Sequence, residues 1–126
     1  MQLLGHELVP YSPLYKVKSI EDISKTPAQS TVIISFDEFL IKHCQENGVP
    51  FALHVNNKNE AIIANAAGAL LLLIKEDIAK EVQALADHYL FDAKVALCIN
   101  QNLSLEKAIE LGVDMAIFDK AIIQHN

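Results

Sequence analysis

The sequence predicts a single small α/β domain with a mainly parallel sheet of five or six strands. The chain has 126 residues, which is the size of one ordinary domain. From residue 31 onward, short apolar runs alternate with helical patterns. These runs are apolar at nearly every position, as expected for strands that are buried on both faces of a parallel sheet. A half-barrel and a flavodoxin-like arrangement of βα units both fit this pattern.

Five apolar runs are predicted to be the strands. Residues 14–17 form a sixth, shorter apolar run, which could be a further short strand. Between the strands, three glycines follow helical patterns where a left-handed cap turns the chain back, namely Gly48, Gly68 and Gly112. The five predicted strands cover residues 31–36, 51–55, 70–74, 94–99 and 114–118.

The segments between the strands show helical spacing. One stripe follows Ile78, Val82, Leu85 and Tyr89, and a second begins after Ser104, a plausible N-cap. A third includes Leu40, Ile41 and Cys44, and a fourth helix is expected at residues 59–67.

The first 30 residues follow a different pattern. Three prolines interrupt them, and Ser19 is predicted to cap one short helical turn. The many apolar side chains favour an arm that packs on the core or adds an edge strand to it. We therefore divide the chain into an N-terminal arm, residues 1–30, and a βα-repeat core, residues 31–126.

Charge and composition exclude several functions. Ten Lys and Arg residues against 16 Asp and Glu residues give a net charge of -6, which disfavours nucleic-acid and membrane-surface partners. The apolar stretch 61–74 is shorter than the roughly 20 residues that cross a bilayer. The first residues lack the pattern of a secretory signal, so we expect a cytoplasmic protein. Cys44 and Cys98 are expected to be core side chains rather than a redox pair.

Residues 51–119 carry a resemblance to a known family. The strand-like runs 70–74, 94–99 and 116–118, with helical patterns between them, resemble consecutive βα units of the TIM-barrel phosphate-sugar enzymes, such as indole-glycerol-phosphate synthase. The resemblance implies a catalytic glutamate at the position of Cys98 and an Asn at the position of Asp119. The chain is also about half of the roughly 250 residues of a full barrel. We therefore expect the architecture to carry over and the activity not to.

A phosphoacceptor receiver domain is an alternative of similar length. Asp37 and Glu38 resemble its acidic pair, and Lys120 resembles its lysine. The third strand of a receiver ends in the acceptor aspartate, whereas Ile74 is followed here by Lys75. This difference removes the nucleophile.

Polar residues follow each predicted strand. Because the carboxyl ends of parallel strands share one edge, where ligands bind in α/β proteins, these residues are candidates for a ligand-binding site. Strand ends also carry residues that cap the following helix, which is the alternative explanation. The candidate ligand-binding residues are Asp37, Asn56, Lys75, Asn100 and Asp119.

The sequence contains no pattern that identifies an activity. His54 lies in an apolar strand near the same edge, where it is either a general base or a histidine with a structural role. The five histidines show no metal-ligand spacing, and the usual phosphate-loop and nucleophile-elbow motifs are missing. We therefore expect no metal and no cofactor.

The helix expected at residues 59–67 is apolar nearly all the way round. An outer helix of a small α/β domain normally has a polar face. We therefore expect a homodimer or larger homo-oligomer with Ile62 and Ile63 in its interface.

Two functional hypotheses follow. The first is a non-catalytic scaffold, regulatory or ligand-sensing protein. The second is a protein or enzyme that binds a small, phosphorylated metabolite at the carboxyl ends of the strands.

Overall fold

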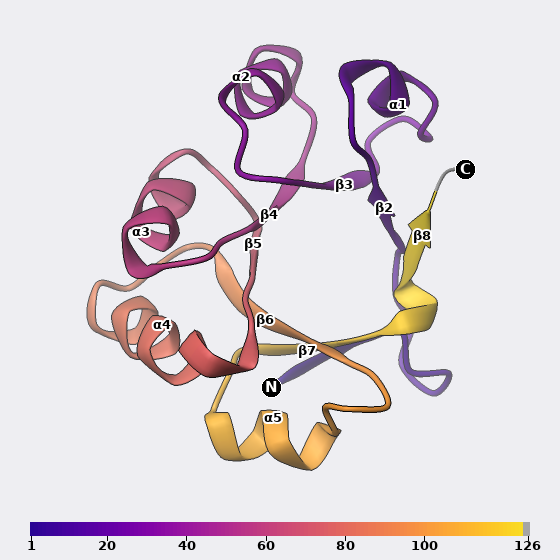
Figure 1. Ribbon diagram of the computed structural model, residues 1–126. Coiled ribbons are helices and arrows are strands. Elements are labelled where there is room, and N and C mark those ends of the chain that lie inside the picture. The colour runs from indigo at the N-terminus through magenta and orange to yellow at the C-terminus, as the bar shows by residue number, and fades with distance from the viewer. Residues whose placement is uncertain (125–126) are drawn as a thin grey trace.

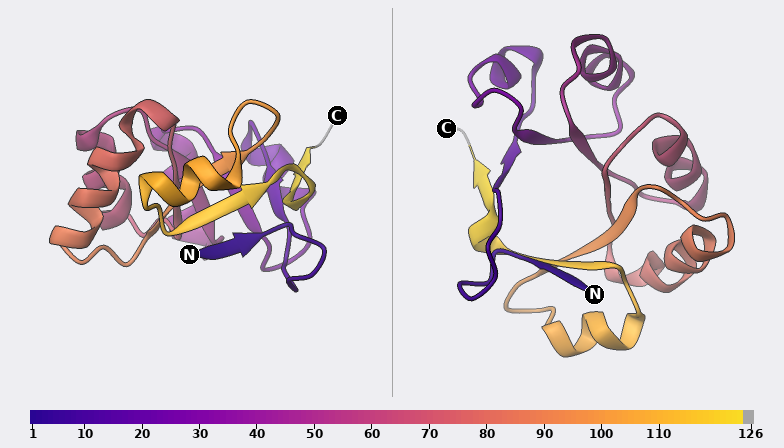
Figure 2. Two further views of the ribbon diagram at one scale, coloured as in Figure 1. Left: turned by 90° about the horizontal axis from the view of Figure 1, so that it is seen from below. Right: turned by 180° about the vertical axis from the view of Figure 1, so that it is seen from behind.

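The computed structural model describes residues 1–124, and they form one α/β domain around a curled, all-parallel sheet (Figure 1). The sheet is a half-barrel of alternating βα units with its helices on the outer side (Figure 2). The strands are β1 Gln2–Leu4, β2 Leu14–Lys16, β3 Thr31–Ile34, β4 Phe51–His54, β5 Leu71–Leu73, β6 Lys94–Ile99, β7 Met115–Phe118 and β8 Ile122–Gln124. The helices are α1 Ile20–Ser24, α2 Glu38–Asn47, α3 Lys58–Ala66, α4 Glu76–His88 and α5 Leu105–Leu111, and a 3₁₀ turn, η1, covers Asp119–Ala121.

The chain connectivity explains why the sheet curls. The strand order is β1-β7-β6-β5-β4-β3-β2-β8, and every neighbouring pair is parallel. In a flat sheet, β7 and β8 would lie six strand spacings apart, which is about 29 Å. The three residues of η1 that join them span at most about 14 Å. The sheet therefore has to bend round until its two ends meet, at a place that we call the seam.

The sheet separates two hydrophobic cores. The larger core lies between the outer face of the sheet and the helices, and includes Val32, Leu53, Leu72, Val95 and Leu97. The smaller core fills the inside of the curl and contains Leu14, Ile33, Ala52, Leu71, Leu73, Ala96, Met115, Ile117 and Ala121. Burial on both faces explains why the central strands are apolar at nearly every position.

A buried polar network joins the elements at the amino ends of the strands. The Gln83 side chain from α4 is 5% exposed, and its amide group donates to the carboxylates of Asp87 and Asp114 at 3.0 and 3.1 Å. Its carbonyl oxygen accepts the Asp114 backbone N–H at 3.0 Å, and the Asp114 carboxylate accepts the Val95 N–H. This network therefore ties α4 to the starts of β6 and β7.

The predicted fold class is confirmed, with two refinements. The half-barrel is the alternative that the structure contains, and the flavodoxin-like one is wrong because the helices lie on only one side of the curled sheet. The sheet has eight strands rather than five or six, because β1 and β8 add to it. Ser19 and Ser104 cap α1 and α5 as predicted, with side chains that accept backbone N–H groups. Gly48 and Gly112 are the left-handed caps of α2 and α5, and Gly68, with φ +98°, turns the chain directly after Ala67, the cap residue of α3, so the three predicted turns are confirmed.

Residues 1–30 contribute to both ends of the sheet. β1 is one edge strand and pairs with β7, while β2 lies between β3 and the other edge strand, β8. The segment between β1 and β2 therefore runs across the seam (Figure 1).

Candidate ligand-binding site at the mouth of the half-barrel

The strands all finish at one end of the curl, which Figure 1 faces and which we call the mouth. Side chains alternate between the two faces of a strand, so a residue two positions after an inner-core residue points the same way. Six polar or reactive side chains stand in this relation to Leu14, Ile33, Ala52, Leu73, Ala96 and Ile117. They form the mouth ring: Lys16, Ser35, His54, Lys75, Cys98 and Asp119.

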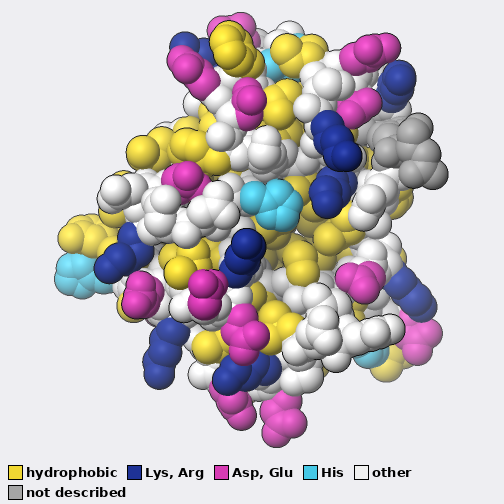
Figure 3. Space-filling model, viewed as in Figure 1, with side chains coloured by type: hydrophobic (Ala, Val, Ile, Leu, Met, Phe, Trp, Pro, Cys, Tyr) yellow, Lys and Arg dark blue, Asp and Glu magenta, His cyan; other side chains and the backbone are white. Residues whose placement is uncertain are grey.

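Figure 3 shows the mouth in space-filling form. A histidine side chain lies near the centre of this face, with basic and acidic side chains around it and hydrophobic surface visible between them. The apolar floor is the inner core, and the charged groups are at its rim. The mouth thus combines a hydrophobic base with a few polar groups, as ligand sites commonly do.

The first of two cavities at the mouth, the central pocket, has a volume of about 370 Å³. It is lined by His54, Asn56, Lys75, Cys98 and Asn100, among others. Leu73 and Leu97 supply apolar lining, and Glu76 lies at the start of α4 beside Lys75.

His54 is the last residue of β4, and water reaches part of its ring. Desolvation within the curl lowers the pKa of the His54 imidazole, and the positive charge of Lys16 lowers that pKa further. Lys16 ends β2, two strands from β4 in the sheet, so its charge acts across the mouth. His54 is therefore mainly neutral at pH 7 when the mouth is empty.

Cys98 lies on β6 and is half-buried. Burial raises the pKa of its thiol, and the carboxylate of Asp119 raises that pKa further, whereas Lys16 lowers it. Burial is the largest of these effects, so the thiol is protonated at neutral pH and is a weak nucleophile. Cys98 is thus not simply the core residue expected from the sequence, because it also lines the central pocket.

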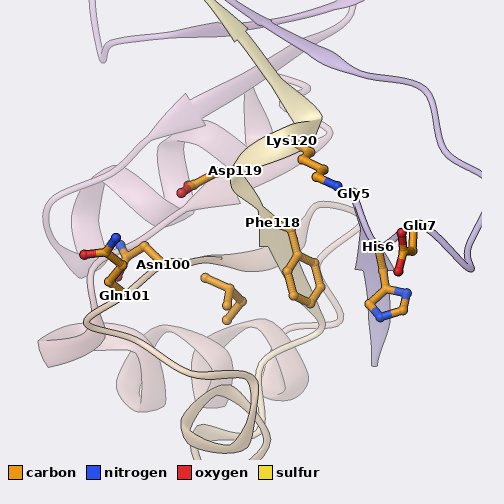
Figure 4. Close-up of a pocket in the computed structure, with 9 residues that line it drawn as sticks. Gly5, His6, Glu7, Asn100, Gln101, Phe118, Asp119 and Lys120 are labelled. Carbon is orange, nitrogen blue, oxygen red and sulfur yellow. The ribbon is translucent and has the colours of Figure 1, made fainter.

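The second cavity, the seam pocket, has a volume of about 500 Å³ and lies where η1 follows β7 (Figure 4). It is lined by His6, Glu7, Asn100, Phe118, Asp119 and Lys120, together with Gly5, Ile99 and Gln101. The half-buried Phe118, just before the 3₁₀ turn, lines this cavity. The two cavities share Asn100.

The structure gathers four of the five predicted site residues around these cavities. Asn56, Lys75 and Asn100 line the central pocket, and Asn100 and Asp119 line the seam pocket. Asp37 lines neither of them, because its carboxylate accepts the Leu40 N–H at 3.1 Å and caps α2. Asn100 also has a local structural role, because its side-chain oxygen accepts the backbone N–H groups of Asn102 and Leu103.

Sequence reasoning did not find Lys16, His6, Glu7 or Phe118. Lys16 ends a strand of only three residues, so no pattern showed which way its side chain points. His6 and Glu7 come from the segment that crosses the seam, and their position depends on strand pairing that the sequence did not predict. The only signal available was the two-residue step from Leu14 to Lys16.

Ile62 and Ile63 lie on α3 and are 45% and 53% exposed. An apolar outer surface is thus present at the predicted interface. Self-association stays a prediction, because these exposures describe a single chain.

The described residues 1–124 contain no group of three or more His, Cys, Asp or Glu side chains that could hold a metal ion. Within the same residues, no helix has the length and apolar character needed to cross a membrane. No model of a known protein family matches the chain, and no curated protein sequence matches it. The mouth itself is therefore the basis of the functional argument.

Proposed function

We propose that the protein is a ligand-sensing domain that binds a small anionic molecule, such as a phosphorylated metabolite, in the central pocket. The observation that carries the proposal is the pair of lysines at the mouth. Neither Lys16 nor Lys75 has an ion-pair partner within residues 1–124, although the protein carries a net charge of -6. Lys75 lines the pocket and offers an entering anion a charge-assisted hydrogen bond, and the Lys16 charge attracts the anion from across the mouth.

Three further groups support an anionic ligand. The amide groups of Asn56 and Asn100 line the same cavity. The Asn56 NH₂ donates one hydrogen bond to the Glu60 carboxylate at 3.4 Å and has a second N–H for a ligand, and the Asn100 NH₂ is also a donor. His54 becomes a third cation if the bound anion raises its pKa. The curled sheet agrees with the TIM-barrel-like resemblance, and the phosphate-sugar enzymes of that resemblance favour phosphate as the acidic group.

Sensing is favoured over catalysis by the state of the Cys98 thiol. Burial keeps this thiol protonated, which makes it a weak nucleophile. The resemblance implies a catalytic glutamate where Cys98 stands, so the general acid or base of those enzymes has no counterpart at this position. Binding needs only the lysines and amides.

The test is the thermal unfolding of the wild-type protein and of Lys75→Met with increasing inorganic phosphate. A ligand at a hundred times its dissociation constant stabilises the folded state by about 2.7 kcal/mol. We expect phosphate to raise the melting temperature of the wild type and to have much less effect on Lys75→Met. Lys94→Met is the matched control, because Lys94 is an exposed lysine at the start of β6, at the end of the sheet away from the mouth.

Equal phosphate stabilisation of the wild type and Lys75→Met contradicts the proposal. So does an absence of stabilisation by phosphate, alkyl phosphates and small carboxylates. If Lys94→Met loses the effect as well, the anion binds through general charge rather than in the pocket, and the proposal is also overturned.

A further inference from the structure

We infer that the ligand is amphoteric: it carries an ammonium group in addition to its acidic group, and the seam pocket receives the ammonium. This inference rests on the proposed function, because it assigns the second cavity of the same mouth. The acidic group would occupy the central pocket, beside Lys75, with Lys16 across the mouth.

The first observation is that the two cavities adjoin. They share Asn100, which follows β6. Lys75 follows β5 and Asp119 follows β7, so these residues lie on either side of β6 in the sheet. Neighbouring strands are about 4.8 Å apart, which separates the two backbones by about 10 Å. A small molecule with its two charged groups a few bonds apart spans this distance.

The second observation is that the two cavities differ in charge: Lys75 and Glu76 balance each other in the lining of the central pocket, whereas the seam pocket has two carboxylates and one ammonium group, that of Lys120. Asp119 and Glu7 place carboxylates in the seam pocket, and neither has an ion-pair partner within the described part of the chain. In Figure 4, the Asp119 carboxylate points towards the side of Asn100, whereas the Lys120 side chain points the other way, towards Gly5 and Glu7. The face of the seam pocket next to the central pocket is therefore acidic.

Electrostatic effects on Cys98 agree with this separation of charge. Cys98 lies on β6, between the two cavities, and the Asp119 carboxylate and the Lys16 ammonium act on its thiol in opposite directions. Both charges thus act at Cys98, which lines the central pocket.

The third observation is an aromatic surface in the seam pocket. The Phe118 ring lies between Asn100 and His6 in Figure 4, and the His6 ring meets it edge-on at a centroid distance of 5.6 Å. His6 is held in place because its Nδ1 accepts the Leu8 N–H at 3.1 Å. An aromatic face beside a carboxylate attracts ammonium groups by cation–π and Coulomb interactions.

Ligands with one kind of charge fit the mouth less well. An acid without an ammonium group leaves the Asp119 carboxylate unpaired and is repelled by it. An amine without an acidic group is repelled by Lys16 and Lys75. A molecule with both groups pairs each set of charges.

Calorimetric titration with matched compounds tests the inference. The phosphate series compares 2-aminoethyl phosphate with ethyl phosphate, and 4-aminobutyl phosphate with butyl phosphate. The carboxylate series compares 5-aminopentanoate with pentanoate and shows which acid the central pocket prefers. In the series that binds, we expect the aminated compound to bind about three- to tenfold more tightly than its amine-free counterpart.

Asp119→Asn locates the effect. This variant should bind the aminated and amine-free compounds with equal affinity, while its affinity for the amine-free compound stays at or above that of the wild type. That second measurement shows that the variant is folded and that its central pocket works. Asp92→Asn, which alters an exposed carboxylate just before β6, is the matched control and should keep the preference.

The outcomes separate the inference from the proposed function. If amine-free acids bind through Lys75 and the amine adds nothing, the inference is overturned and the proposed function stands. If the amine preference survives in Asp119→Asn, the ammonium lies elsewhere and the inference is overturned. If no acid of either series binds, both are overturned.

Discussion

Gln83 is the buried polar side chain that links α4 to the start of β7, and its hydrogen bonds predict a large effect of mutation. Gln83→Leu would leave the Asp114 backbone N–H and one carboxylate oxygen without their partner. Each buried group left unpaired costs about 1–3 kcal/mol, so we expect the free energy of unfolding to fall by about 2–4 kcal/mol. Urea denaturation measures this change.

Gln45→Leu is the control for that experiment. Gln45 is exposed and donates one hydrogen bond to the Ala67 carbonyl at 2.9 Å. Its replacement should cost less than about 1 kcal/mol, because water takes the place of the lost partner. Equal effects of the two substitutions would show that the Gln83 network contributes nothing beyond one exposed hydrogen bond.

His54 predicts a pH dependence of stability. Its pKa in the folded protein is lowered below the ordinary value of 6.5, so the unfolded chain binds a proton more readily than the folded one. The contribution of neutral His54 to the free energy of unfolding is fully present above pH 6.5. It is lost as the pH falls through 6.5 towards the pKa of His54 in the folded protein. We expect the free energy of unfolding to decrease over this window, and to decrease less in His54→Asn.

Nuclear magnetic resonance titration of the His54 ring measures the pKa itself. In the empty protein it should lie below 6.5, and phosphate should raise it, because a bound anion stabilises the imidazolium. By the same linkage, an anion whose own charge is constant over this pH range, such as sulfate, should bind more tightly as the pH falls. A pKa at or above 6.5 without phosphate contradicts the prediction.

The sequence predicted which residues lie near the mouth, but it did not predict which of their side chains point into a cavity. Asn56, Lys75 and Asn100 were found because each follows a long apolar run, and the carboxyl ends of parallel strands come together. Asp37 follows such a run too, but its carboxylate caps a helix instead of lining either cavity. The sequence offers the same residue types for both roles, so the direction had to come from the structure.

At the level of elements, the starts of α2 and α4 show how capping and binding compete. Asp37 caps α2 with its carboxylate, whereas Lys75 occupies the N-cap position of α4 and makes no side-chain capping bond. Asp37→Ala should therefore lower the free energy of unfolding by about 1 kcal/mol and leave phosphate affinity unchanged. Lys75→Asp should add about 0.5–1 kcal/mol of stability and abolish phosphate binding.

Chemical denaturation and phosphate titration of these two variants check both halves of the prediction. Loss of phosphate binding in Asp37→Ala would place Asp37 in the site after all. A destabilised Lys75→Asp would show that Lys75 has a structural role. It would contradict the idea that a ligand-binding residue takes the place of a better N-cap at the start of α4.

Elements were predictable where local chemistry determines them. The Ser19 and Ser104 caps mark helix starts, and β6 was predicted at its observed bounds, because runs of this length are distinctive. β1 and β8 have three residues each and become strands only because β7 and β2 offer free edges to pair with. Such strands depend on tertiary pairing, so no local pattern announces them.

For the whole molecule, closure of the curl is the feature that creates the seam pocket. The sequence left the half-barrel and the flavodoxin-like sheet open, since the short η1 link forces the curl only once β8 is known to pair with β2. The resemblance over residues 51–119 did not include the strands that close it. The second cavity was therefore beyond prediction, although four of the five candidate residues line the mouth.

Gly5 is where the closure is tightest. It follows β1 with φ +100°, and a Cβ built on it would lie 3.0 Å from the Ala121 Cβ and 3.1 Å from the Phe118 Cβ. Gly5→Ala thus combines an unfavourable backbone conformation with crowding between the two ends of the sheet. We expect the free energy of unfolding to fall by about 2–4 kcal/mol.

Gly68→Ala separates these two causes, because Gly68 has nearly the same φ, +98°, and a Cβ built on it would meet nothing within 4 Å. Its replacement should cost only the backbone part, about 1–2 kcal/mol. The difference between the two variants, measured by denaturant unfolding, is then the cost of forcing the seam apart. Because the Phe118 ring forms part of the seam pocket, Gly5→Ala should also weaken the preference for aminated ligands, whereas Gly68→Ala should not. Equal destabilisation by both substitutions would mean that the ends of the sheet yield freely, and that closure does not hold the seam pocket in shape.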